Sequence, residues 1–205
     1  MIVYKSIVGI DYSITSPGVC VFDISAKDFK FANCKFYYST EKLSAAHRGA
    51  NITGHFAPEC QCPEQRFDQL SEWAIKLFAS NSLVGIEGYS YSSFGLNFSV
   101  GENLGLLKYK LWKRGIYSGN YPVTVNPASL KKFATGKGNA TKVDMFEAFK
   151  SADPDGYAML NDVIPIKLKK IGVKKPKFEF SAPISDLIDA YFICKFMKET
   201  HFQVP

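Results

Sequence analysis

Two short apolar runs separated by a polar turn open the chain and predict a β-hairpin. The run 7–10 is rich in β-branched residues and carries no charge, which favours a central strand buried on both faces. Turn residues follow at 16–18, and a second apolar run begins at Val19. Asp11 closes the first run, so the pattern places a carboxylate at the edge of a buried sheet. Taken alone, Asp11 is most simply a turn-capping residue, but a divalent cation is a partner that would make such a buried charge useful.

The rest of the hydrophobic pattern predicts an α/β class. Three successive strands predict an antiparallel meander, and strands then alternate with amphipathic helices up to a C-terminal helix that starts at Ser185 as its N-cap. Besides the first hairpin, we expect strands at 29–39, 83–86 and 121–125, and helices at 64–80, 99–114, 130–135, from Thr141 onward, and at 185–199.

Two segments interrupt this pattern. Residues 40–63 lack periodicity and are interpreted as a long loop, and residues 152–181 are polar, rich in lysine and interrupted by proline, which indicates an insertion. No internal repeat is present, so we expect one domain over 1–205 that carries insertions near 40–63 and 152–181.

Cys60 and Cys62 lie close to His47 and His55, which raises the question of a zinc site. The spacing fits no standard finger, and a second CxxC or HxxxH is missing. An irregular loop is the favoured interpretation, and the sequence does not decide whether these cysteines bind a metal.

Composition narrows the class of protein and of partner. The chain has 205 residues, 46% of them hydrophobic, and no apolar run is long enough to span a bilayer. Five cysteines and an N-terminus without signal-peptide regions predict a reduced, intracellular protein without membrane contact. The net charge is +6, and lysines gather in two clusters, 131–142 and 167–177. The second cluster contains no acidic residue. Such runs favour a polyanionic partner over an ordinary solvated face.

Acidic residues recur at the ends of the buried elements. Asp11 and Glu87 each end a strand, while Asp186 and Asp189 lie three residues apart on one face of the last helix. If these four acids converge, they repel one another strongly unless cations are present, and oxygen ligands of this kind suit Mg²⁺ or Mn²⁺. An acid in a first helical turn is ordinary, but Asp189 lies among apolar residues, which favours a functional site.

Four motifs in order carry a family resemblance: IVGIDYSITSPGVCVFD, VGIEGYSYSSFG, NPASLKKFATGKGNATK and SDLIDAYFI. Together they resemble the RuvC-type Holliday-junction resolvases of the RNase H-like nuclease superfamily, and the two insertions are more typical of viral or phage members. The resemblance implies an RNase H-like fold in which a mixed five-stranded sheet, an antiparallel meander followed by parallel strands, is flanked by helices.

The same resemblance implies a crossover-junction endodeoxyribonuclease that acts as a homodimer on four-way DNA junctions in recombination or repair. Its acids would bind two Mg²⁺ ions per active site, with Mn²⁺ as a substitute, and its dimer interface would involve the helix at 99–114. The matching residues are Asp11, Glu87, Asp186 and Asp189 as catalytic metal ligands; Lys142 as a catalytic lysine; Lys131, Lys132, Lys137 and Lys142 on the DNA backbone; and Tyr89, Tyr91 and Phe94 as candidates for base stacking.

Two alternatives stay open. A nuclease of the same fold could cut branched, flap or RNA–DNA hybrid substrates instead, or the protein could bind junctions as a scaffold without catalysis. Packing beneath a loop is as good an interpretation of the three aromatic residues as stacking on a base.

Overall fold

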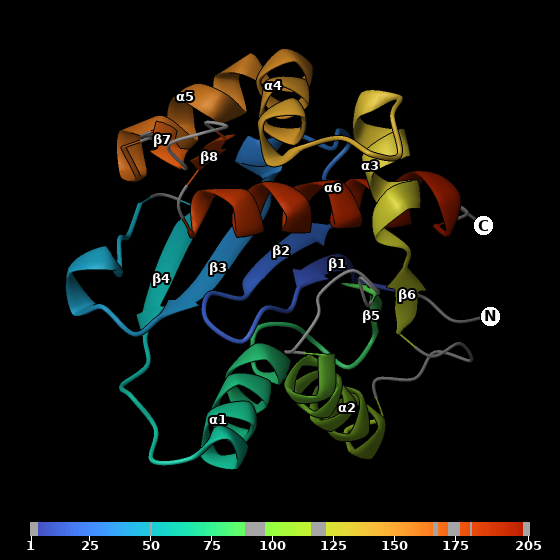
Figure 1. Cartoon of the computed structure of the whole chain (residues 1–205). Helices are drawn as coiled ribbons and strands as arrows, with labels where there is room; N and C mark the ends of the chain where they lie inside the picture. Colours follow the sequence, from blue (N-terminus) through green and yellow to red (C-terminus); the bar gives the residue numbers. More distant parts are fainter. Residues whose placement is uncertain are drawn as a thin grey trace.

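A mixed sheet of six strands forms the centre of the molecule (Figure 1). The computed structural model describes residues 4–49, 51–88, 97–115, 122–165, 168–171, 177–180 and 182–202. The strand order is β4-β3-β2-β1-β5-β6, with β1–β2–β3 antiparallel and β5 and β6 parallel to β1, which confirms the predicted α/β class and the meander. The strands are β1 (Ser6–Asp11), β2 (Gly18–Asp23), β3 (Cys34–Thr40), β4 (Ile52–Phe56), β5 (Ser82–Glu87) and β6 (Val123–Val125).

The predicted count of five strands is wrong, because β4 lies inside the segment 40–63 that was interpreted as a loop. β4 pairs in parallel with β3 at the edge of the sheet, after a connection that contains a 3₁₀ turn, η2 (Leu43–Ala45). Its backbone is tied on the other side by the amide of Gly54, which donates to the carbonyl of His47 at 2.7 Å. β4 is short and has one buried aliphatic side chain, Ile52, so its sequence pattern is weak.

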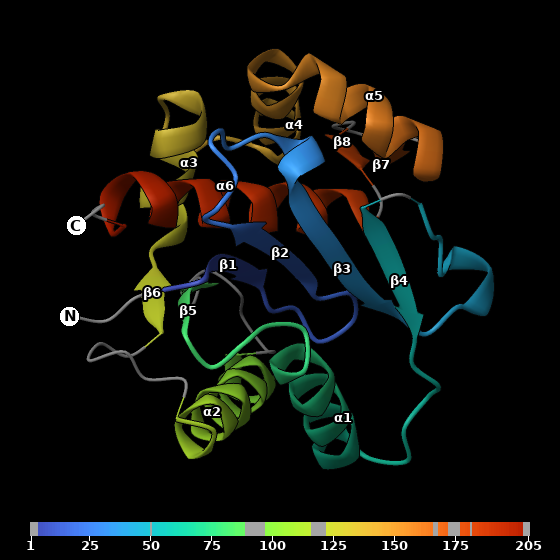
Figure 2. The same cartoon turned by 180° about the vertical axis from the view of Figure 1, so that it is seen from behind.

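Helices cover both faces of the sheet, as the views from the front and from behind show (Figures 1 and 2). One face is covered by α6, with α3, α4 and α5 beyond it, and the other face by α1 and α2. Alternate residues of β1 divide accordingly, since Ile7 belongs to the core beneath α6 while Val8 and Ile10 belong to the core beneath α1 and α2. The helices are α1 (Pro63–Ile75), α2 (Asn97–Lys113), α3 (Pro127–Thr135), α4 (Lys142–Ala152), α5 (Pro154–Val163) and α6 (Ile184–Thr200).

Helix α6 lies unusually close to the strands beneath it because two glycines face it. A Cβ at Gly9 of β1 would overlap the carbonyl oxygen of Ala190 and the amide nitrogen of Cys194, and a Cβ at Gly18 of β2 would overlap the carbonyl of Asp186. The side chains that other residues carry would push the helix away from the sheet. The absence of these side chains therefore lets the first turns of α6 lie beside the end of β1.

The segment 152–181 contains regular structure. Its first part is α5, whose N-cap Asp153 accepts a hydrogen bond from the amide of Gly156 at 2.9 Å. Its later part contains an antiparallel pair of strands, β7 (Leu168–Ile171) and β8 (Lys177–Phe180). Whether 40–63 and 152–181 are insertions in one domain stays a prediction.

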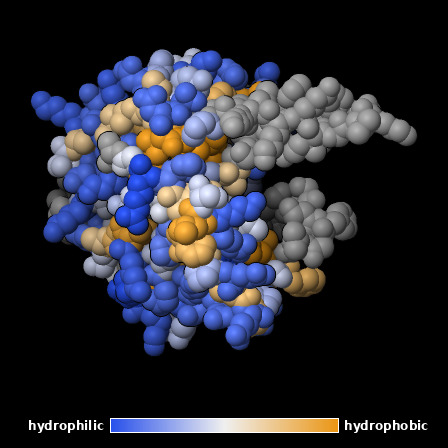
Figure 3. Space-filling view, turned by 90° about the vertical axis from the view of Figure 1, so that its left-hand side faces the viewer, coloured by the Kyte–Doolittle hydropathy of each residue, from blue (hydrophilic) through white to orange (hydrophobic). Residues whose placement is uncertain are grey.

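On the face at the left of Figure 1, hydrophobic residues form small patches that hydrophilic residues separate (Figure 3). None of the described helices combines the length and the hydrophobicity that crossing a bilayer requires.

Candidate functional site

Three elements bring four carboxylates to one edge of the sheet. β1 and β5 run in parallel with Ile10 opposite Ile86, and Asp11 and Glu87 are the next residue of each strand. α6 crosses this edge with its first turns, where Asp186 and Asp189 lie. Asp11 is 9% exposed and Asp186 7% exposed, so two of the four charges are buried outright. We call these four residues the carboxylate cluster: Asp11, Glu87, Asp186 and Asp189.

Burial and mutual repulsion destabilise the charged form of Asp11. Its pKa is raised well above the usual value, first by burial and then by the charges of the other three members of the cluster. Burial also raises the pKa of Glu87, against the lowering effect of a hydrogen bond with Asp11 and of Lys131 and Lys142.

The two acids of α6 respond in the same direction. Burial raises the pKa of Asp186, while Lys142 and hydrogen bonds with Ser16, Ser185 and Asp11 lower it. Burial, followed by the charges of Glu87 and Asp186, raises the pKa of Asp189 to about 8. When all four carboxyls are ionised, they therefore repel one another strongly unless positive charge lies nearby.

The donor set of the cluster fits a hard divalent cation, because it consists of carboxylate oxygens alone. As the side chains lie, however, no three His, Cys, Asp or Glu residues in the described ranges are placed to hold one metal ion together. A cation bound here would require the carboxylates to turn toward it. The residues that would hold it are those of the carboxylate cluster.

Two of the four candidate lysines approach the cluster. Lys142 is the first residue of α4, where the N-cap Thr141 and Asp144 form a capping box that fixes the start of the helix. Lys142 lowers the pKa of every member of the cluster, and Lys131 of α3 lowers the pKa of Glu87 and Asp189.

Lys132 and Lys137 are exposed and lie elsewhere. Lys137 lines an open hollow between the end of α3 and α4, beside Asp144 and Glu147. The lysines that the sequence treats as one basic segment therefore fall into two groups, one at the carboxylates and one on the surface.

Three residues around the cluster were missed from the sequence. Ser16 and Ser185 hydrogen-bond to Asp186, Ser185 across 3.3 Å. Arg66 of α1 is buried and donates to the carbonyls of Ile14 at 3.2 Å and Thr15 at 3.3 Å, which holds the turn that carries Ser16. Serines in a polar turn and an arginine in an amphipathic helix give no sequence signal of such roles. The turn between β1 and β2 is thus fastened to α1 on one side and to α6 on the other.

The prediction that Ser185 is the N-cap of the last helix is wrong. α6 begins at Ile184 with Pro183 as its N-cap, and no side chain caps it. Ser185 lies inside the first turn, so its hydroxyl is available to Lys142 and Asp186.

Tyr89, Tyr91 and Phe94 lie outside the described residues. Cys60 contacts the side-chain oxygen of Gln69 at 3.3 Å, and His55 stacks on Trp73.

The sequence matches no protein-family model and no curated protein. Among solved structures, it is similar to a Thermus thermophilus RuvC structure with 19% sequence identity and a TM-score of 0.50, over 95% of each chain. A structure of T. thermophilus RuvC in complex with Holliday junction substrate aligns with 18% identity and a TM-score of 0.49, over 93% of this chain and 91% of that chain. The likeness shows that the chain has the RNase H-like fold of RuvC, with six strands in its sheet.

Proposed function

We propose that this protein is a structure-specific endonuclease that cuts four-way DNA junctions by metal-dependent hydrolysis of phosphodiesters. The observation that carries the proposal is the convergence of four carboxylates, with raised pKa values, at the edge of an RNase H-like sheet. Buried like charges are costly, and the fold gains no packing from them. Their presence together is best explained by a cationic cofactor.

The carboxylate cluster would hold two Mg²⁺ ions, or Mn²⁺ ions in their place. Such ions supply a water nucleophile at neutral pH and neutralise the charge that develops on the leaving oxygen. The protein's own part is to keep the carboxylates ionised and oriented, which Lys142, Lys131 and the hydroxyls on Asp186 favour. Without cations, the negative charges of the cluster would repel a DNA phosphate. Binding of DNA at this edge of the sheet would therefore depend on bound cations.

The basic residues would hold the DNA backbone on both sides of the cleaved bond. Lys142 and Lys131, whose charges act on the cluster, would contact the reacting phosphate, and the exposed Lys132 and Lys137 would contact flanking phosphates. Tyr89, Tyr91 and Phe94 remain candidates for stacking on unpaired bases at the centre of a junction.

A homodimer would allow two opposed strands to be cut. α2 buries Leu104, Leu107 and Leu111 against the sheet and exposes aromatic rings on other sides. Tyr109 is 52% exposed and Trp112 is 55% exposed, and their rings lie 5.9 Å apart. Paired aromatic rings of this kind are frequent at protein interfaces, which supports α2 as the dimer contact.

A panel of labelled DNA substrates tests the choice of substrate. Junction, flap, RNA–DNA hybrid and linear duplex of matched sequence would be incubated with Mg²⁺, and product would be quantified on denaturing gels. Preferential cutting of the junction supports the proposal. Equal cutting of flaps or hybrids would make the protein a broader nuclease, and tight junction binding without cutting would make it a scaffold.

A further inference from the structure

The charge of Lys142 lowers the pKa of all four members of the carboxylate cluster. The residue is exposed at the start of α4, and its ammonium nevertheless reaches Ser185, which is buried beside Asp186. A lysine side chain carries its charge on a flexible four-carbon stem, so the charge can move several ångströms without movement of the helix.

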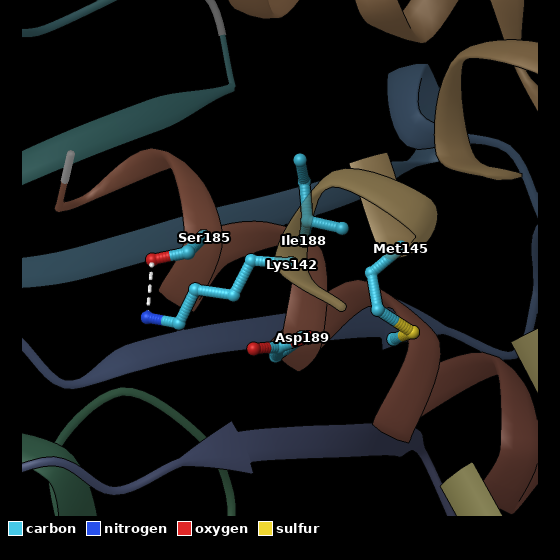
Figure 4. A pocket seen from close by; sticks show the side chains of 5 residues that line it. All are labelled: Lys142, Met145, Ser185, Ile188 and Asp189. Atoms are coloured by element: carbon cyan, nitrogen blue, oxygen red, sulfur yellow. Dashed lines mark hydrogen bonds between the residues drawn. The ribbon is translucent and has the colours of Figure 1, made fainter. Parts of the chain in front are cut away.

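Ser185 contacts this ammonium through its hydroxyl. Lys142 Nζ donates to Ser185 Oγ at 3.4 Å, and Ser185 Oγ donates to Asp186 Oδ1 at 3.3 Å. Figure 4 shows the Lys142 side chain extended from α4 toward the first turn of α6, between Ser185 and Asp189. Both hydrogen bonds are long, so attraction to the carboxylates contributes most to holding the ammonium near the site, and the hydroxyl adds a weak tether.

Little space is open beside the Lys142 side chain at Asp189. The pocket lined by Lys142, Ser185, Asp189 and two apolar residues, Met145 and Ile188, has a volume of about 10 Å³. That is close to the minimum for a single water, roughly 10–15 Å³. Mg²⁺ in proteins keeps several of its waters. A cation bound at Asp189 would therefore compete with the Lys142 side chain for this part of the cluster.

We propose that Ser185 tethers Lys142 as the resident counter-cation of the carboxylate cluster, and that divalent cations displace this ammonium when they bind. The inference rests on the proposed function, because it deepens the account of the same site. The displaced ammonium is repelled by the incoming ions and becomes available to a DNA phosphate. Metal loading and phosphate binding are thereby coupled through one side chain.

Binding of Mn²⁺ in the absence of DNA tests the proposal. Isothermal titration calorimetry at about pH 8 would compare the full-length wild-type protein with Lys142→Met. Loss of a charge this close to a site typically changes ionic equilibria by a factor of about ten or more, so we expect Lys142→Met to bind Mn²⁺ about tenfold more tightly. Lys150→Met, two turns along the same helix, removes the same charge away from the cluster and is expected to bind as the wild type does.

Two serine variants separate the tether from a general charge effect. Ser185→Ala is expected to shift Mn²⁺ affinity in the same direction as Lys142→Met but by less, and Ser185→Thr, which keeps the hydroxyl, is expected to restore the wild-type value. Thermal unfolding adds a readout that does not depend on activity. In EDTA, Lys142→Met should melt at a lower temperature than the wild type, and saturating Mg²⁺ should remove the difference.

The outcomes distinguish this inference from the function beneath it. If the wild type binds Mn²⁺ but Lys142→Met binds it equally or more weakly, the counter-cation role is wrong while the metal site stands. If Ser185→Ala matches the wild type in affinity, the tether is wrong. If the wild type binds no divalent cation, the proposed nuclease function and this inference fall together.

Discussion

Replacement of Asp189 by asparagine is expected to stabilise the protein in the absence of divalent cations, although Asp189 is a proposed catalytic residue. Burial and the charges of Glu87 and Asp186 raise the pKa of Asp189 to about 8, whereas an aspartate in an unfolded chain has a pKa near 4. The folded protein therefore binds this proton more tightly than the unfolded chain does. This contribution to stability is fully present below about pH 4 and is lost as the pH rises through about 8.

The magnitude follows from the difference in pKa. About four pKa units correspond to about 5–6 kcal/mol when the group is fully ionised. The protein relaxes and water enters around the ionised group, which recovers a large part of this energy. We expect Asp189→Asn to exceed the wild type in unfolding free energy by about 2 kcal/mol at pH 8, and to differ little from it near pH 5.

Urea unfolding in EDTA across this pH range measures the effect. Asp144→Asn is the contrasting variant, because hydrogen bonds with Thr141 lower the pKa of that exposed carboxyl and its loss should destabilise the capping box. A smaller decline of stability with pH in Asp189→Asn than in the wild type is the expected result. If Asp189→Asn is the less stable protein at pH 8, or if both proteins show the same pH dependence, the carboxylate cluster is not electrostatically destabilised.

Three further outcomes are expected. Gly9→Ala should lower the free energy of unfolding by about 1–3 kcal/mol, because its methyl group meets the backbone of α6. Gly105→Ala, with open space around the added methyl group, should not lower it. If Gly9→Ala is as stable as the wild type in urea unfolding, the close packing of α6 on β1 is contradicted. Mn²⁺ affinity should increase with pH up to about 8, because Asp189 has to lose its proton before it can bind the metal. A Mn²⁺ affinity that does not change over this range in calorimetry contradicts the role of Asp189 as a ligand. Trp112→Asp should sediment as a monomer and lose paired cuts; an unchanged dimer in analytical ultracentrifugation places the interface elsewhere.

The parts of the fold that sequence could predict are those with a strong hydrophobic pattern. The strand that ends at Asp11 and the strand that ends at Glu87 are continuous apolar runs, and the helix at 184–200 has too many apolar residues to be a loop. The start of α4 was predictable as well, because Thr141 and Asp144 are the residues of a capping box. These elements position all four acids, so the core of the candidate site was accessible from sequence.

The missed parts depend on tertiary contacts. β4 forms because β3 offers a free edge and the backbone of 47–49 supports its other side, neither of which its own residues reveal. Ser185 and Lys142 are 43 positions apart in the chain and meet only because α4 and α6 both start at the same sheet edge. Likewise, only the structure separates Lys142, at the acids, from Lys137, beside Asp144 and Glu147.

The most direct test of the proposed function is cleavage of a synthetic mobile four-way junction, mapped to the nucleotide. Wild-type protein would be compared with Asp11→Asn and with a control, Asp155→Asn on the exposed side of α5, each with Mg²⁺ and with EDTA. We expect symmetric paired nicks from the wild type and Asp155→Asn with Mg²⁺, and none with EDTA or from Asp11→Asn. Undiminished cutting by Asp11→Asn, or cutting in EDTA, would contradict a metal-dependent site built on the carboxylate cluster.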